Sequence, residues 1–210
     1  MASTSPTYEQ ALAGLTAPDG PFAIVDGEIR GVPVRLFRNA PPTLRDFVRG
    51  AREKGDAEYL VYENERYTYA QVFQRVDALA AALVQRYGLR PGDRVAIAMR
   101  NYPEWIVAYF AATAIGAVAV GINAWWTTAE LDYGLRDSGA RVMFADRERL
   151  ERAAPLLGEL APLGLRVVAV RTEAADLPAG VERWDDVLAA YAGAALPDVD
   201  VAPDRDAMIL

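Results

Sequence analysis

Short apolar segments that can form buried strands recur at a nearly constant spacing through the middle of this chain. They begin near residues 94, 117, 141 and 166, one about every 24 residues. Each is continuously apolar, and the stretches between them carry helical patterns of hydrophobic residues. This period is typical of β-α-β units, whose right-handed crossovers produce a mostly parallel sheet. The sequence therefore predicts an α/β fold with three layers, in which helices cover both faces of the sheet.

Two of the segments between strands begin with a capping box, in which side chains three residues apart satisfy backbone N–H groups at a helix start. Thr68 and Gln71 have this spacing, and the helix that follows them is expected to run to about Tyr87. Thr127 and Glu130 have it as well. Both pairs predict the exact turn at which a helix begins.

The other helices have weaker start signals. Asn101, with Pro103 close behind it, is expected to begin a helix whose residues 105–115 are apolar almost all round, so that helix is expected to be buried. Asp146 is expected to cap the helix after the third strand. Pro155 is expected to break or kink that helix, because proline lacks the N–H that the helical ladder needs.

Two hairpins are expected before the first buried strand. Asp26-Gly27 separates the apolar runs 22–25 and 29–32, and Asp-Gly between apolar runs predicts a tight turn. In the second, residues 59–62 and 67–69 flank a polar stretch.

Composition excludes several classes of function. The chain has no cysteine and no histidine, which removes disulfides, the Ser-His-Asp triad and thiolate or imidazole metal sites. Its net charge of −7, from 29 acidic and 22 basic residues, opposes broad binding to nucleic acid or anionic lipid. No secretory signal and no stretch of roughly 18 apolar residues is present, so a cytoplasmic protein without an integral membrane segment is expected.

Five motifs in a fixed order carry a resemblance to a known family. They are Tyr67-Thr68-Tyr69-Ala70, Gly88-Leu89-Arg90-Pro91-Gly92-Asp93-Arg94-Val95-Ala96, Asn101-Tyr102-Pro103-Glu104-Trp105, Ala114-Ile115-Gly116-Ala117-Val118 and Asp137-Ser138-Gly139-Ala140-Arg141. With this order and spacing the chain resembles the N-terminal part of an AMP-forming acyl-CoA synthetase of the adenylate-forming superfamily. The resemblance implies the truncated N-terminal domain of such an enzyme.

The chain divides accordingly into three parts. Residues 1–57 are interpreted as an N-terminal extension and lead-in segment, residues 58–191 as the α/β subdomain of the AMP-binding domain, and residues 192–210 as a linker and the start of a further strand. Residues 207–210 are apolar, and an unpaired strand edge there predicts possible self-association.

The resemblance implies an ATP-dependent acid:CoA ligase that acts through an acyl-adenylate, with a fatty acid as the expected carboxylic acid and with ATP, Mg²⁺ and CoA as cofactors and substrates. In the family a Ser/Thr/Gly-rich loop holds the ATP phosphates, and that loop would follow Leu210, as would the catalytic lysine. We therefore expect no catalytic residue and no metal site in this chain, tight binding of none of these cofactors, and no activity of the chain alone. The alternative is a stand-alone, non-catalytic α/β interaction module derived from that family.

Two groups of residues are candidates for ligand contacts. Trp125 and Trp126 follow a strand and could form the wall of an acyl or aryl pocket, or could pack a loop onto the protein. Arg149 and Arg152 share a helix face, with Arg147 close by, and the resemblance makes them candidates to bind the CoA phosphates. The glutamates between them favour an ordinary solvated helix face instead.

Overall fold

The computed structural model describes residues 5–210, and within that range its main feature is a six-stranded sheet. The strand order is β10-β6-β5-β7-β8-β9, and every neighbouring pair is parallel. The strands are β5 (Arg94–Ala98), β6 (Val118–Gly121), β7 (Ala140–Asp146), β8 (Arg166–Val170), β9 (Glu182–Arg183) and β10 (Met208–Ile209). The predicted parallel sheet is confirmed, with strands at each of the four expected places.

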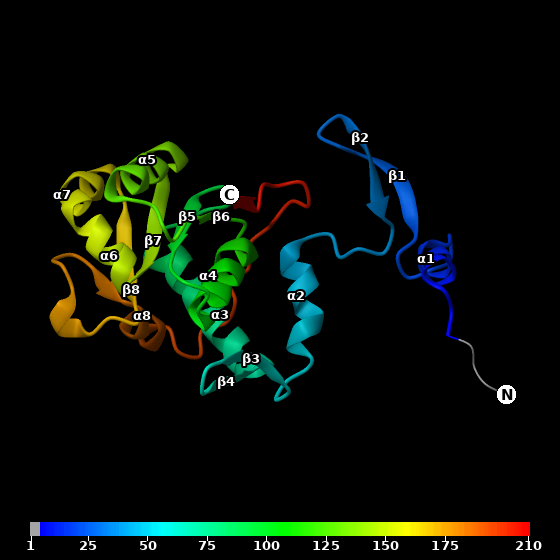
Figure 1. The fold of residues 1–210 in the computed structure, drawn as a ribbon, viewed down its shortest axis with the longest axis horizontal. Helices are drawn as coiled ribbons and strands as arrows, with labels where there is room; N and C mark the ends of the chain where they lie inside the picture. Colours follow the sequence, from blue (N-terminus) through cyan, green and yellow to red (C-terminus); the bar gives the residue numbers. More distant parts are fainter. Residues whose placement is uncertain (1–4) are drawn as a thin grey trace.

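Helices cover both faces of this sheet (Figure 1). The helices on one face are α3 (Tyr69–Gln85), α4 (Pro103–Ala114) and α8 (Trp184–Ala190), and those on the other are α5 (Thr128–Ser138), α6 (Arg147–Ala153) and α7 (Leu157–Leu160). Because side chains alternate along a strand, β5 sends Val95 and Ile97 into the first core and Ala96 and Ala98 into the second. The three-layer α/β architecture is therefore confirmed.

Most of the expected helix boundaries are confirmed. Thr68 and Thr127 each form a complete capping box with the residue three positions later. Asp146 caps α6 by accepting a hydrogen bond from the backbone N–H of Arg149 at 3.1 Å. That helix ends at Ala153 and continues as a 3-10 turn containing Pro155, as the missing N–H requires.

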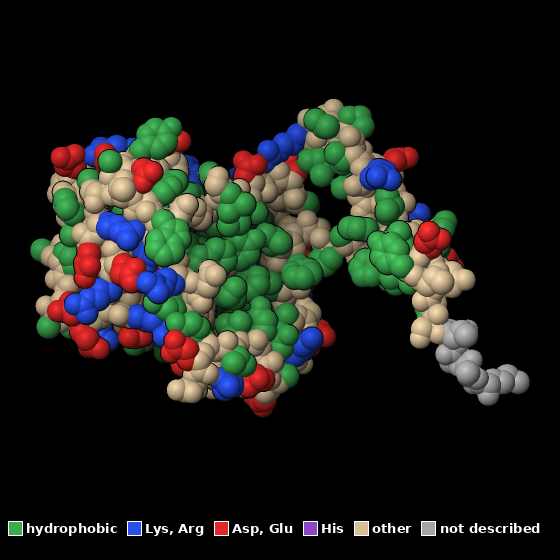
Figure 2. All heavy atoms as spheres, viewed as in Figure 1, with side chains coloured by type: hydrophobic (Ala, Val, Ile, Leu, Met, Phe, Trp, Pro, Cys, Tyr) green, Lys and Arg blue, Asp and Glu red, His purple; other side chains and the backbone are tan. Residues whose placement is uncertain are grey.

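Helix α4 departs from two expectations. Its N-cap is Tyr102 rather than Asn101, and no side chain caps it; Pro103 at the first helical position presents no N–H that would need a partner. The helix is also not wholly buried, because Ile106 and Phe110 are only partly covered. Figure 2 shows hydrophobic side chains gathered over this region, beside α2 (Leu44–Arg52). The neighbouring elements cover only part of the helix circumference.

The N-terminal elements form an arm that projects from this body (Figure 1). It consists of α1 (Tyr8–Thr16), β1 (Ile24–Ile29) and β2 (Val32–Phe37). Arg30, at the tip of the hairpin, reaches the C-terminal segment, where it donates to Asp206 Oδ1 at 3.0 Å and to the backbone oxygen of Asp204. Residues near the two ends of the chain are thereby joined.

The predicted turn of this hairpin was placed wrongly. Asp26-Gly27 lies inside β1, and the turn is Arg30-Gly31, where both residues have positive φ (50° and 80°). Positive φ at both central residues matches the twist of a two-residue hairpin turn. Gly27 instead lies within the paired strands, where it leaves room for a neighbour, because a Cβ on Gly27 would lie 2.6 Å from Leu36 Cδ1.

The second hairpin forms where it was expected, and the C-terminal residues add a strand to the sheet. Strands β3 (Glu58–Tyr62) and β4 (Glu65–Thr68) form the expected hairpin, with only Glu63 and Asn64 in the turn. At the C-terminus, Met208 and Ile209 pair with β6 and form the outermost strand of the sheet. Self-association through that edge stays a prediction. Within residues 5–210 no helix is long and apolar enough to cross a membrane.

Candidate functional site

The strand order of the sheet reverses direction at β5. Strand β6 lies on one side of β5 and β7 on the other, while α4 and α5, which make the two connections, cover opposite faces. Parallel sheets of this kind bind ligands beyond the carboxyl ends of the strands at such a switch point. The candidate site therefore comprises the residues that follow β5, β6, β7 and β8 at this edge.

Asp146, the last residue of β7, is the buried centre of this edge. One carboxylate oxygen accepts from the backbone N–H of Arg100, just after β5, at 2.9 Å. The guanidinium of Arg149 donates to both carboxylate oxygens at 3.0 and 3.1 Å. The side chains of both members of this ion pair are almost fully buried, with 3% of Arg149 and 5% of Asp146 exposed. The pair joins the ends of β5 and β7 and fixes the start of α6.

The two candidate arginines of α6 also hold the loop after β6. Arg149 donates to the backbone oxygen of Ala124 through Nε at 3.0 Å and Nη2 at 2.8 Å. Arg152 donates to Ala124 and Trp126 oxygens at 2.9 and 3.0 Å. Arg149 is thus not on a solvated helix face, and its donors are already paired within the protein. A role for Arg149 and Arg152 in holding CoA phosphates stays a prediction, and Arg149 could take it only by releasing these partners.

The two tryptophans of that loop have different environments. Trp126 packs on α5 so closely that a Cβ on Gly134 would lie 2.4 Å from its ring. Trp125 is 81% exposed, and its backbone N–H donates to Asn123 Oδ1 at 2.9 Å. Trp126 therefore packs against the protein, whereas the ring of Trp125 is exposed beside the carboxyl edge. A role for either residue in a ligand pocket remains a prediction.

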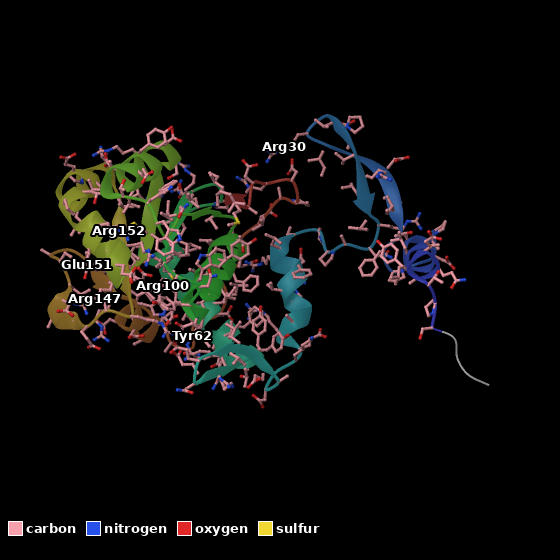
Figure 3. The ribbon with its side chains drawn as sticks, in the orientation of Figure 1. Arg30, Tyr62, Arg100, Arg147, Glu151 and Arg152 are labelled. Carbon is pink, nitrogen blue, oxygen red and sulfur yellow. The ribbon has the colours of Figure 1, made fainter. Side chains whose placement is uncertain are left out.

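Exposed charges surround the buried pair. Figure 3 shows Arg100, Arg147, Glu151 and Arg152 on the same face of the molecule. Arg100 pairs with Glu148 at 2.7 Å and Arg147 with Glu151 at 3.3 Å, and all four side chains are largely exposed. Exposed ion pairs of this kind are weak. Anion binding at this face stays a prediction.

A second group of charges, which sequence reasoning missed, lies at the end of β8. Arg171 donates to both carboxylate oxygens of Glu65 at 2.7 and 2.9 Å and to those of Glu104 at 2.9 and 3.1 Å. Its guanidinium carbon also lies 5.1 Å from the ring centre of Tyr62 and 4.8 Å from that of Tyr102. We call these five residues the Arg171 clamp.

The pKa values of Glu65 and Arg171 in the clamp, and of Tyr67 beside it, are shifted. The hydrogen bond from Arg171 lowers the pKa of the Glu65 carboxyl, and the hydrogen bond to Glu65 raises the pKa of Arg171. Burial, aided by a hydrogen bond to Glu65, raises the pKa of Tyr67 to about 12. Opposite charges and donors stabilise the ionised forms of both clamp partners. The Glu65–Arg171 pair is therefore ionised at neutral pH.

No metal site is evident in the part of the chain that the structure describes: residues 5–210 contain no group of three or more His, Cys, Asp or Glu side chains placed to hold an ion. The carboxyl edge offers cations, aromatic rings and backbone groups. This chemistry suits the binding and orientation of an anionic or aromatic ligand.

Comparisons with known proteins identify relatives. The family described as AMP-binding enzyme matches residues 47–210. A feruloyl-CoA synthase from Amycolatopsis is 39% identical over 141 residues, covering 64% of this chain and 28% of the relative. A benzoate–CoA ligase from Thauera aromatica is 35% identical over 103 residues, covering 49% of this chain and 20% of the relative.

Solved structures give the same fold. The crystal structure of an anthranilate CoA ligase in complex with anthranoyl-AMP has a TM-score of 0.66 and 24% identity, and the match covers 80% of this chain and 31% of that one. At this identity the likeness shows the fold alone. The chain matches less than a third of the length of each of these three proteins.

Proposed function

The chain belongs to the AMP-binding enzyme family, and from this premise we propose that it is the N-terminal part of an ATP-dependent, AMP-forming carboxylic acid:CoA ligase. The observation that carries the proposal is the family match, which spans the whole parallel sheet from β5 to β10. The names of the relatives, a feruloyl-CoA synthase and a benzoate–CoA ligase, support transfer of an acid to CoA.

The residues of this chain would supply the scaffold rather than the chemistry. The buried Asp146–Arg149 pair and the contacts of Arg152 fix the loop after β6 at the carboxyl edge. No G-x-x-x-x-G-K-[ST] or G-x-G-x-x-G sequence, which could wrap backbone N–H groups around phosphates, occurs in the 210 residues. We therefore propose that ATP and Mg²⁺ are used by the whole enzyme and are not held tightly by this chain alone.

The acid is proposed only as a carboxylic acid of apolar character. A fatty acid is our expectation from the overall resemblance, and the relatives named for ferulate and benzoate make an aromatic acid the competing substrate. Both classes would need an apolar wall, to which the exposed ring of Trp125 could contribute.

Pyrophosphate exchange tests the proposal directly. The purified 210-residue chain should give only background exchange with ATP and either a fatty acid, ferulate or benzoate. An antibody raised against it should detect, in the source cells, a species well above 22.9 kDa, and that species, once purified, should catalyse acid-dependent exchange. A 22.9 kDa species alone would instead favour the stand-alone interaction module. Exchange by the isolated chain would contradict its proposed inactivity.

For CoA, we propose that Arg147, which is exposed, and Arg152, which is half-buried, receive the phosphates at the carboxyl edge. Arg147 and Arg152 lie on the same face as Arg100, and their partners are exposed carboxylates or backbone oxygens. Binding of adenosine bisphosphate, measured by calorimetry at low salt, should weaken in Arg147→Gln and Arg152→Gln. A matched control is Arg141→Gln, whose side chain pairs with Asp93 on the opposite edge of the sheet. Equal affinities in all three variants would rule out this site.

A further inference from the structure

A pocket of about 360 Å³ lies between strand β3 and the start of helix α4. Its walls are mostly apolar and include the side chains of Leu60, Val61, Tyr62, Tyr102, Trp105 and Ile106. Its volume falls within the range of pockets that bind small ligands. The pocket opens at the carboxyl edge of the sheet, since Asn101 and Tyr102 lie in the short segment between the end of β5 and the start of α4. None of the arginines of α6 lines it.

The Arg171 clamp holds two of the pocket's aromatic rings in place. The rings of Tyr62 and Tyr102 are nearly perpendicular, with centres 5.5 Å apart, and the guanidinium of Arg171 lies over both. Glu65 anchors the guanidinium to the β3–β4 hairpin, and Glu104 anchors it to the first turn of α4. The hairpin and the helix are thus fixed at the separation that leaves the pocket open.

The backbone of Arg171 is in a strained conformation, so the contacts of the clamp must hold it in place. Arg171 has φ of 51°, a left-handed conformation that a residue with a long side chain seldom adopts. Its side chain is still 30% exposed, so the clamp contributes little to the hydrophobic core. Strained residues persist where surrounding contacts hold them and often mark binding sites. The contacts that offset the strain here are those that orient the two tyrosines.

Charge restricts what the pocket can accept. The single positive charge of Arg171 is already matched by two carboxylates, Glu65 and Glu104, so the clamp carries a net charge of about −1. An anionic ligand would be repelled, and the guanidinium already covers one face of each tyrosine ring, where a ligand cation would otherwise bind. The open walls are the side chains of Val61, Trp105 and Ile106. These walls are apolar, and the ring of Trp105 offers an aromatic surface on which a ligand ring can stack.

We propose that this pocket binds an uncharged, planar aromatic group, and that Arg171 is the residue that positions its walls. The site is separate from the one proposed for CoA phosphates, and it excludes the ionised end of a carboxylic acid. The inference does not depend on ligase activity, because it rests on the clamp and the pocket alone.

The first test measures binding of N-phenylnaphthylamine, an uncharged aromatic dye that fluoresces in apolar surroundings, to the 210-residue chain. Val61→Asp places a charge on the pocket wall at a position that is 54% exposed, so the fold should tolerate it. We expect this variant to weaken dye binding by about tenfold or more, because an apolar ligand cannot pair the new carboxylate. The matched control is Leu163→Asp, which is 68% exposed in the opposite layer and should bind the dye like the unmodified chain.

Two further measurements separate positioning from general stability. Arg171→Gln should weaken dye binding while Arg141→Gln, which also loses a surface ion pair, should not. Naphthoate, an anion of similar shape, should compete with the dye at least about tenfold more weakly than naphthalene. The proposal is overturned if Val61→Asp binds the dye as well as Leu163→Asp does, or if naphthoate competes as well as naphthalene. The comparison of Val61→Asp with Leu163→Asp tests the proposal even if Arg171→Gln does not fold.

Discussion

The buried Asp146–Arg149 pair should dominate the stability of the carboxyl edge, and Asp146→Ala is the perturbation that tests it. This substitution removes the buried counter-ion of the Arg149 guanidinium, which is only 3% exposed, and leaves it with the half-exposed carboxylate of Glu148. Removing one partner of a buried ion pair costs about 3–5 kcal/mol. The same change removes the N-cap of α6 and the acceptor for the backbone N–H of Arg100, so the expected loss lies at the upper end of that range.

Removing Arg149 instead of Asp146 should lower the free energy of unfolding by less. In Arg149→Met the Asp146 carboxylate keeps its two backbone donors, the N–H groups of residues 100 and 149. The guanidinium bonds to Asp146, Ala124 and Glu148 are lost, but Ala124 keeps the hydrogen bond from Arg152. Hydrogen bonds to charged groups contribute about 1.5–3 kcal/mol, so we expect a loss of about 2–3 kcal/mol. In the double variant no buried unpaired charge remains, and its loss should fall short of the sum of the single losses by about 1.5–3 kcal/mol.

Urea unfolding followed by circular dichroism measures all three free energies of unfolding. Arg141→Met, which breaks the exposed pair with Asp93, is the control and should lose less than about 1 kcal/mol. A coupling energy below about 0.5 kcal/mol between Asp146 and Arg149 would refute the reasoning, as would an Asp146→Ala variant as stable as the control.

Three other changes have definite expected outcomes. Thr68→Ala should lower the free energy of unfolding by about 1 kcal/mol in the same urea assay, because it removes a complete capping box. Gly134→Ala should cost about 1–3 kcal/mol and shift tryptophan fluorescence to the red, because its Cβ would displace the ring of Trp126. Glu65 has a lowered pKa in the folded state, so its contribution is present above the unfolded pKa, close to 4.5, and is lost as pH falls through the folded value. Glu65→Gln should therefore show a smaller loss of thermal stability than the unmodified chain on acidification below pH 4.5, and identical pH profiles would contradict this assignment.

Local signals predicted most of the fold. The strands could be located because continuous apolar runs alternate with helical patterns, and the capping boxes at Thr68 and Thr127 specify helix starts through contacts only three residues long. The hairpin turn was misplaced because Asp26-Gly27 and Arg30-Gly31 are both plausible turns, and only the pairing of β1 with β2 distinguishes them.

The site was harder to predict because its contacts are distant in sequence. Arg171 lies 67 residues from Glu104 and 106 from Glu65, so no spacing rule connects them. Arg149 was a candidate for phosphate binding because of the family resemblance, and the nearby glutamates favoured a solvated helix face instead. Its burial depends on Ala124, which approaches α6 only once β6 and β7 flank β5.

The pairing of β10 with β6 has a consequence for synthesis on the ribosome. Strand β6 is complete at Gly121, but its outer edge stays open until Met208 and Ile209 have been made. At about 5–20 residues per second this interval lasts roughly 4 to 17 s. During that time an apolar strand edge is available to other nascent chains, so the yield of folded protein should depend on how well the translating cell shields that edge.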